Sequence, residues 1–107
     1  MTTVTFRTDR ERVTGFTCQG HSGYAEAGED IVCAAVTSAV RLCECTINDV
    51  LLAEADVAVD AITAEITLTL SPAGKHRREC EQVLEGLFLY MRELSKENPD
   101  HLTVMEV

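Results

Sequence analysis

A histidine and a cysteine twelve positions apart, His21 and Cys33, are the residues of this chain that best suit chemistry. A thiolate is a strong nucleophile, and a neighbouring imidazole can accept the thiol proton, which is the arrangement that cysteine catalysis needs. Cys33 is expected in the first turn of a helix, where the partial positive charge of the helix start favours the thiolate. The unpaired backbone amides of that turn could also stabilise an oxyanion. One corner of the fold could thus supply a nucleophile, a base and oxyanion donors.

A glycine-rich loop from Gly20 to Glu29 is predicted between the histidine and the cysteine. Four of the six glycines lie between Gly15 and Gly28, which concentrates backbone freedom beside the proposed site. We expect the loop to move over a bound peptide as a gate. Tyr24 could pack over that peptide or hold the loop in place when the site is empty. The residues expected to form the mobile loop and contact substrate are Gly20, Ser22, Gly23, Tyr24, Glu26, Gly28 and Glu29.

Asp30 is a candidate supporting residue or helix N-cap. A helix starting at Ile31 would let its carboxylate accept the amide hydrogen of Val32 or Cys33. The carboxylate would oppose ionisation of Cys33 if it approached the sulfur. It would favour ionisation if it bound the helix amides or oriented His21. The sequence leaves both roles open.

The elements that must position these residues follow the order β-β-α-β-β-α-β. Alternating polar and apolar residues predict strands over 3–7, 12–19, 57–59, 62–70 and 102–107, with a bulge at Gly15. Apolar residues every three or four positions predict helices over 31–52 and 73–97, the second opened by Ser71-Pro72 and ended by Asn98-Pro99. Residues 1–107 are expected to form a single domain of the α+β class. Its two layers would be two helices on one face of a mostly antiparallel sheet of about five strands.

The composition excludes several classes of protein. The net charge of −9 argues against direct nucleic-acid binding and suits either simple solubility or attraction of a basic partner. The five cysteines show no disulfide spacing, and we see neither a signal peptide nor a run of about 20 apolar residues. We therefore expect reduced thiols, a cytoplasmic location and no membrane association.

No metal or other cofactor is expected. Cys43 and Cys45 lie two positions apart on a predicted helix, so their side chains point in different directions, and no spacing matches a zinc module. Cys43 and Cys80 fall on apolar helix stripes and are expected in the core. Cys18, at the end of a predicted strand near the proposed site, is either a core residue or a bystander thiol.

The stretch Gly20-His21, then Gly28, then Asp30-Ile31-Val32-Cys33-Ala34-Ala35-Val36 resembles the signature of the ribosomal-processing cysteine protease family, Prp. The resemblance extends over essentially the whole chain in length and element order. Ser22 and Thr37 stand where alanine and serine are frequent in the family. The resemblance implies a cytoplasmic, homodimeric cysteine endopeptidase that removes the N-terminal extension of ribosomal large-subunit protein twenty-seven. It also implies that Cys33 is the nucleophile and His21 its base, with Asp30 as a supporting residue.

A different class of function fits the same residues. A non-catalytic, ribosome-associated module could use the loop to bind a basic protein tail. The pH dependence of thiol alkylation would separate the two, since a protease needs an activated thiol and a binding module does not.

Overall fold

One mixed sheet of five strands forms the first layer of the fold. The computed structural model describes residues 1–20 and 27–107, with the backbone alone for 27–30. The strands are in the order β3-β4-β2-β1-β5, and all neighbours are antiparallel except β1 and β5, which are parallel. Their bounds are β1 (Thr2–Asp9), β2 (Arg12–Gln19), β3 (Asp56–Asp60), β4 (Glu65–Thr69) and β5 (Leu102–Glu106).

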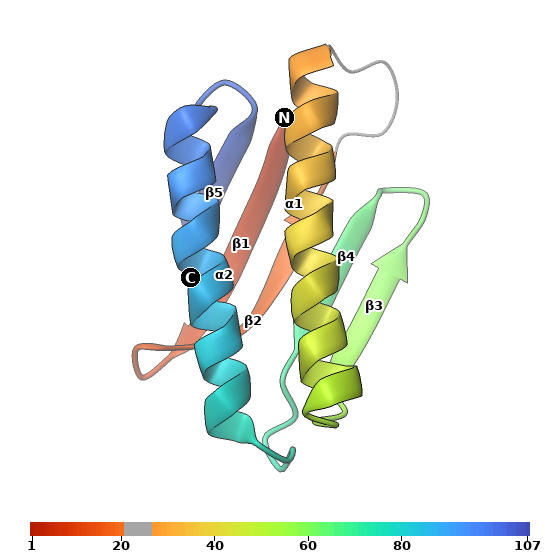
Figure 1. The fold of residues 1–107 in the computed structure, drawn as a ribbon, viewed down its shortest axis with the longest axis vertical. Helices are drawn as coiled ribbons and strands as arrows, with labels where there is room; N and C mark the ends of the chain where they lie inside the picture. The colour runs from red at the N-terminus through yellow and green to blue at the C-terminus, as the bar shows by residue number, and fades with distance from the viewer. Residues whose placement is uncertain (21–26) are drawn as a thin grey trace.

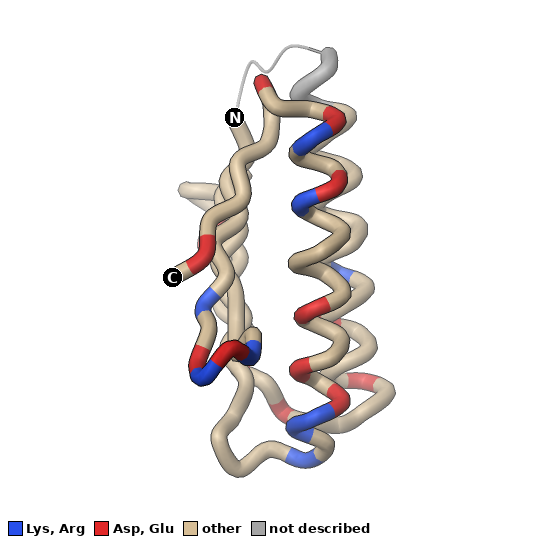
Figure 2. The backbone as a smooth tube through the Cα atoms, turned by 90° about the vertical axis from the view of Figure 1, so that its left-hand side faces the viewer, with Lys and Arg blue, Asp and Glu red and all other residues tan. Residues whose placement is uncertain are grey.

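Two helices form the second layer. Helices α1 (Ala27–Cys45) and α2 (Arg77–Glu97) lie side by side on one face of the sheet, and no helix of the described residues covers the opposite face (Figures 1 and 2). The predicted α+β class is confirmed, with two helices on one face of a mostly antiparallel sheet.

The core lies between the helices and the sheet. Val4 and Phe6 of β1 alternate with threonines and face the helices, where they are fully buried. The Phe6 ring lies 5.0 Å from the Phe88 ring of α2 in an edge-on contact and 6.2 Å from the Phe16 ring of β2. Such tilted aromatic pairs contribute about 0.5–1.5 kcal/mol beyond the area they bury. The alternation seen in the sequence therefore places every second side chain of β1 in the core.

The predicted irregularity near Gly15 is present. Arg7 lies opposite Gly15, and the register then shifts so that Thr8 lies opposite Val13. The guanidinium of Arg7 donates to the backbone oxygen of Leu68 over 2.8 Å, crossing β2 to reach β4. A side chain at position 15 would collide with Arg7 Nη2 and would stand 2.5 Å from that same oxygen. Glycine is needed here because it leaves room for the arginine.

Helix α1 starts four residues earlier than predicted. Gly28 and Glu29 therefore belong to its first turn and not to the loop, and Asp30 is its fourth residue and not its N-cap. Cys33 is the seventh residue, outside the first turn, so the predicted position beside the unpaired first-turn amides was wrong. Glycine disfavours helix by about 1 kcal/mol relative to alanine, and that local penalty led to the late predicted start.

The C-terminal end of α1 widens into a π-turn, η1 (Thr46–Val50). The Leu51 amide donates to the Thr46 oxygen five residues back over 2.9 Å. Asn48 then accepts a hydrogen bond from the Ala55 amide over 2.8 Å and donates to the Ala55 oxygen over 3.2 Å. One side chain thus satisfies both backbone groups of a buried residue at the start of β3.

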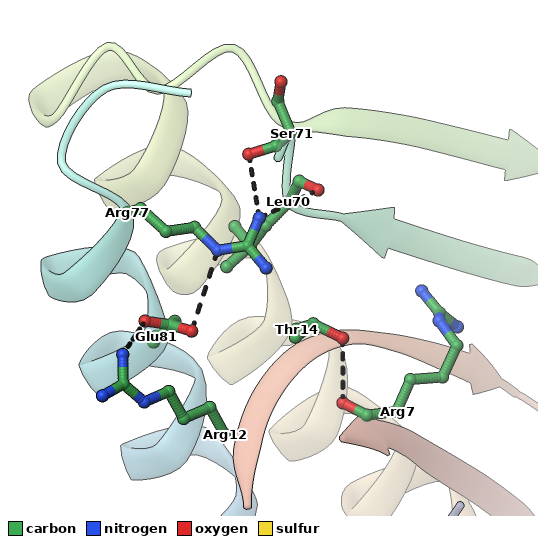
Figure 3. A network of polar contacts seen from close by, with 7 residues as sticks. All are labelled: Arg7, Arg12, Thr14, Leu70, Ser71, Arg77 and Glu81. Carbon is green, nitrogen blue, oxygen red and sulfur yellow. Dashed lines mark hydrogen bonds and ion pairs between the residues drawn. The ribbon is translucent and has the colours of Figure 1, made fainter. Parts of the chain in front are cut away.

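Helix α2 starts at Arg77, later than the predicted Ser71-Pro72 start. Ser71 instead opens a turn, accepting the Gly74 amide over 3.1 Å, and His76 precedes the helix at a φ of 55°. Arg77 donates to the Ser71 oxygen over 2.8 Å and pairs with Glu81, which also pairs with Arg12 (Figure 3). The chain needs these extra residues to cross from the sheet layer to the helix layer. The predicted end of α2 before Asn98 is confirmed.

Residues Ile31–Val50 form a helix long and apolar enough to cross a membrane by length and composition alone, with a mean hydropathy of 1.4. The segment was not predicted to be this apolar because Arg41 and Glu44 interrupt it, although its alanines and cysteines raise the mean hydropathy. In the fold, Val32, Val36, Val40 and Ile47 of this segment are buried in the core.

Candidate active site

A pocket of about 310 Å³ opens between α1 and the tip of the β3–β4 hairpin. It is lined by the last residues of β2 and by the tip of the β3–β4 hairpin, elements that lie far from the start of α2 (Figure 1). Its walls come from α1, from the end of β2 and from both strands of the hairpin. The lining residues are Cys18, Gly20, Cys33, Thr37, Val59, Asp60, Ala61, Ala64 and Ile66.

Cys33 reaches this pocket because of its place on α1. Val32 and Val36 are buried against the sheet, which orients the helix, and Cys33 lies at the edge of that buried face with its side chain half-buried. A Cβ atom built on Gly20 would stand 3.4 Å from the Cys33 sulfur. The thiol therefore lies directly over the end of β2, on the face that holds the helices.

Gly20 and the hairpin turn form the floor of the pocket. The Gly20 amide donates to the Ala64 oxygen over 3.0 Å, which joins the end of β2 to the residue before β4. Ala64 has a φ of 55°, and the Asp60 carboxylate accepts the amide of Ile62 over 2.9 Å within the same turn. These bonds hold the hairpin tip beside the thiol. Ile62 at this tip is 90% exposed.

Cys18 is a second thiol in the same pocket. Its side chain is buried, and burial raises its pKa from 9.0 to about 11, with a further contribution from the negative charge of Cys33. Cys18 is therefore protonated at neutral pH.

Thr37 lies one helical turn after Cys33, and residues four apart on a helix share a face. Among the described residues that line the pocket, Thr37 supplies the only hydroxyl and Asp60 the only charged side chain. The other lining side chains are apolar or thiols. The pocket thus combines a nucleophilic atom, one hydroxyl donor and an apolar wall with an acidic rim.

The predicted site residues fall into two groups in the structure. Gly20 and Cys33 are brought together at the pocket. Gly28, Glu29 and Asp30 lie at the start of α1, and their side chains are outside the described part of the chain. His21, Ser22, Gly23, Tyr24 and Glu26 also lie outside the described residues, so their predicted roles stay predictions.

The β3–β4 hairpin forms one wall of the pocket, and this hairpin wall was not predicted as part of the site. Nothing local marks Val59, Asp60 or Ala64, because their importance comes from the pairing of β4 with β2. That pairing joins residues more than forty positions apart, Cys18 with Ile66 and Gln19 with Glu65. The predicted hairpin, together with the predicted end of β2, could have suggested the wall only if the strand order had been known.

The remaining cysteines lie away from the pocket. Cys80 is buried in the core and Cys43 packs against it, as predicted, while Cys45 is exposed. Within residues 1–20 and 27–107, no three His, Cys, Asp or Glu side chains are grouped so as to hold a metal ion.

Comparison with known proteins assigns the chain to a family. The family model described as "Cysteine protease Prp" matches residues 1–103. The chain belongs to the Prp family of cysteine proteases. No curated protein sequence matches the chain.

Solved structures share the Prp fold over the whole chain. The essential ribosomal processing protease Prp from S. aureus, in complex with a substrate peptide, superposes with a TM-score of 0.89 at 18% identity, covering 100% of both chains. The same S. aureus protease with a covalently linked product peptide gives 0.85 at 19% identity, again over 100% of both. SMU.848 from Streptococcus mutans gives 0.88 at 21% identity, covering 100% of this chain and 94% of that one.

Proposed function

We propose that this Prp-family protease removes the N-terminal extension of ribosomal large-subunit protein twenty-seven, with Cys33 as nucleophile and His21 as base. The observation that carries the proposal is the opening of Cys33 into a pocket walled by α1, the end of β2 and the β3–β4 hairpin. The S. aureus structures, described as a ribosomal processing protease with substrate and product peptides, support a peptide substrate of this kind.

The proposed reaction uses two residues of the pocket, Cys33 and Thr37, together with His21. The Cys33 sulfur attacks the scissile carbonyl carbon while His21 accepts the thiol proton and returns it to the leaving amine. The Thr37 hydroxyl donates a hydrogen bond to the carbonyl oxygen of the scissile bond, which becomes negative during the attack. The backbone amides around Cys33 are not expected to do so, because Cys33 lies beyond the first turn of α1. Water then releases the acyl-enzyme and restores the thiol.

The charge distribution supports a basic substrate. The chain carries a net charge of −9, and Asp60 places a carboxylate at the rim of the pocket. Ribosomal proteins are strongly basic, so the field of the whole molecule would attract one. The apolar lining from Val59, Ala61 and Ile66 would bind apolar side chains of the extension.

The protein is further proposed to act in the cytoplasm as a homodimer, as the family resemblance implies. Large apolar side chains on the outer side of α1 support self-association: Ile31 is 72% exposed and Leu42 is 68% exposed. Sedimentation analysis of the purified protein tests the dimer, and a single monomeric species at micromolar concentration would contradict it.

The test of the reaction is incubation of the purified chain with the source organism's own extended ribosomal protein, followed by mass spectrometry of the products. We expect a single cut within the extension. Cys33→Ala and His21→Ala should each abolish cleavage while leaving the circular dichroism spectrum unchanged.

Cys45→Ser is the matched control, because it removes an exposed thiol on the same helix away from the pocket. It should cleave at the rate of the unmodified protein. Full activity in Cys33→Ala would overturn the assignment of the nucleophile. Binding of the substrate by the unmodified protein with no cut would favour the tail-binding module.

A further inference from the structure

Cys18 is a buried nucleophilic group for which the proposed proteolytic reaction has no use. It lies near the end of β2, is 4% exposed, and lines the same pocket as Cys33. The other free cysteines, Cys43, Cys45 and Cys80, do not line it. Two thiols of the five therefore share one confined space.

The alternation of side chains along β2 places Cys18 and Cys33 on the same side of the sheet, at the same pocket. Residues two apart on a strand face the same side, with about 6.5–7 Å between their Cα atoms. The side of Gly20 that would carry a Cβ faces the Cys33 sulfur, 3.4 Å away. Cys18 faces the helices two residues earlier, so it is the next side chain on that face. The negative charge of Cys33 raises the pKa of Cys18, which agrees with this proximity.

The two thiols differ in their access to solvent. Cys33 is half-buried and opens to the pocket, whereas Cys18 is screened by the core. Burial also keeps Cys18 protonated, and a protonated thiol reacts slowly with oxidants. An oxidant that enters the pocket therefore meets Cys33 first and leaves Cys18 reduced.

We propose that Cys18 is a resolving thiol that forms a reversible disulfide with Cys33 after a hydroperoxide has oxidised Cys33. The proposal rests on the role of Cys33, in the proposed function, as the reactive thiol of the pocket. It adds a covalent modification site, and it makes the protease sensitive to peroxides.

The chemistry balances in two steps. With hydrogen peroxide, the Cys33 thiolate attacks one peroxide oxygen, the O–O bond breaks, and hydroxide leaves, so that Cys33 becomes a sulfenic acid after losing two electrons. Cys18, as thiolate, then attacks the Cys33 sulfur, the S–O bond breaks, and a second hydroxide leaves. Together with the two thiol protons, these hydroxides become two waters. A dithiol reductant reverses the product by thiol–disulfide exchange.

The resolving step would compensate for the low ionisation of Cys18 by proximity. Two groups held in one site can react with an effective concentration of about 10⁵–10⁸ M when they are well oriented. The disulfide would also remove the sulfenic acid before it reaches the irreversible sulfinic and sulfonic states. Cys18 would then protect the nucleophile from permanent loss.

The experiment treats the reduced, full-length protein with a few equivalents of hydrogen peroxide, blocks the remaining thiols, and maps the peptides without reduction. We expect a Cys18–Cys33 cross-linked peptide as the main disulfide product. Cleavage activity should fall at least tenfold and return to most of its starting value with dithiothreitol.

Cys18→Ala and Cys18→Val are the test variants, the second keeping the buried volume. Both should lack the cross-link, accumulate sulfinic Cys33 and recover little activity. Cys45→Ser is the matched control and should behave like the unmodified protein. Oxidation of Cys33 without any Cys18–Cys33 peptide would overturn the proposal, even if both Cys18 variants failed to fold.

The failure of this inference is distinguishable from the failure of the proposed function. The cross-link is read by mass without any substrate, and cleavage is read in the reduced protein without any peroxide. A reduced protein that does not cleave but still forms the cross-link would contradict the proteolytic role and support the disulfide. Cleavage without the cross-link would support the proteolytic role and contradict the disulfide.

Discussion

The hydroxyl of Thr37 is the side chain on which the proposed chemistry can be tested most finely. It lies one turn after Cys33 and, of the described groups around the pocket, is the only hydroxyl. Thr37→Val keeps the shape and removes the donor, so kcat should fall by about 100-fold, as for other oxyanion donors. Thr37→Ser should stay within a few-fold of the unmodified protein. An effect of Thr37→Val on KM alone would show that the hydroxyl binds substrate and does not stabilise the transition state.

The absence of a side chain at Gly20 should matter for activity and not for folding. A methyl group there would meet the Cys33 sulfur at 3.4 Å and the Ala64 oxygen at 3.7 Å, both ordinary contacts. Gly20→Ala should therefore keep the free energy of unfolding within about 1 kcal/mol. It should lower kcat/KM by about tenfold or more, because the methyl group occupies space beside the thiol that a bound peptide needs.

Gly15→Ala provides the opposite control for Gly20→Ala. Its methyl group would collide with Arg7 and would stand 2.5 Å from the Leu68 oxygen. We expect a loss of about 1–3 kcal/mol in urea unfolding with near-normal activity of the folded protein. A larger loss of stability in Gly20→Ala than in Gly15→Ala would contradict the expectation that Gly15 is the more tightly packed of the two positions.

The buried thiol of Cys18 should make stability depend on alkaline pH. The unfolded chain loses this proton near pH 9.0 and the folded chain near pH 11. Between these values the folded state binds more protons, so the free energy of unfolding falls as pH rises. The loss attributable to Cys18 is about 2–3 kcal/mol, complete by about pH 11. Urea titrations from pH 8 to 11 should show a shallower decline for Cys18→Ala, and parallel curves would contradict this account.

At the scale of elements, the junction between η1 and β3 depends on one side chain. Asn48 pairs with both the amide and the oxygen of the buried Ala55. Asn48→Ala should cost about 1–3 kcal/mol in the free energy of unfolding, because both groups lose their partners. Asn48→Asp keeps the acceptor and should cost less. The exposed neighbour Asp49 is the control, and Asp49→Ala should change stability by less than about 0.5 kcal/mol.

The elements show how far local sequence patterns predict this fold. The alternation of apolar residues predicted five strands, and it matches burial best in β1 and β2, whose alternate side chains lie in the core. The strand predicted over 62–70 was too long, because residues 61–64 form the hairpin turn and Ile62 is exposed there. The early start of α1 could not be predicted from Gly28, whose unfavourable helix propensity is overcome by the rest of the helix. The hairpin wall could not be predicted either, because Asp60 and Ala64 join the site through a pairing between distant strands.

The whole molecule is acidic, but its positive charges are unevenly placed. Five of the nine Lys and Arg residues lie in the β1–β2 turn and at the start of α2, at the end opposite the pocket (Figure 2). They are Arg10, Arg12, Lys75, Arg77 and Arg78. Two of them, Arg12 and Arg77, pair with Glu81 (Figure 3). Among its described lining residues, the pocket has one carboxylate, that of Asp60, and no lysine or arginine.

This charge distribution predicts that salt slows processing of a basic substrate. Raising ionic strength from about 0.05 to 0.5 M shortens the Debye length to below 5 Å and screens the attraction. We expect kcat/KM for the extended ribosomal protein to fall on the order of tenfold, with kcat unchanged. A short neutral peptide carrying the same cleavage site is the control and should show little dependence. Equal salt effects on both substrates would rule out long-range attraction.

The parallel pairing of β1 with β5 has a consequence for how each new copy is made. The Val107 amide donates to the Phe6 oxygen, and the Thr8 amide donates back to Val107, so the last strand completes the first. During translation β1 and β2 leave the ribosome early, but one side of β1 has no neighbour until residues 102–107 emerge. A nascent chain therefore carries an open strand edge, which chaperones bind and which invites aggregation. A chain that ends before residues 102–107 would keep this edge open, so we expect it to be degraded and not to add to the active protein.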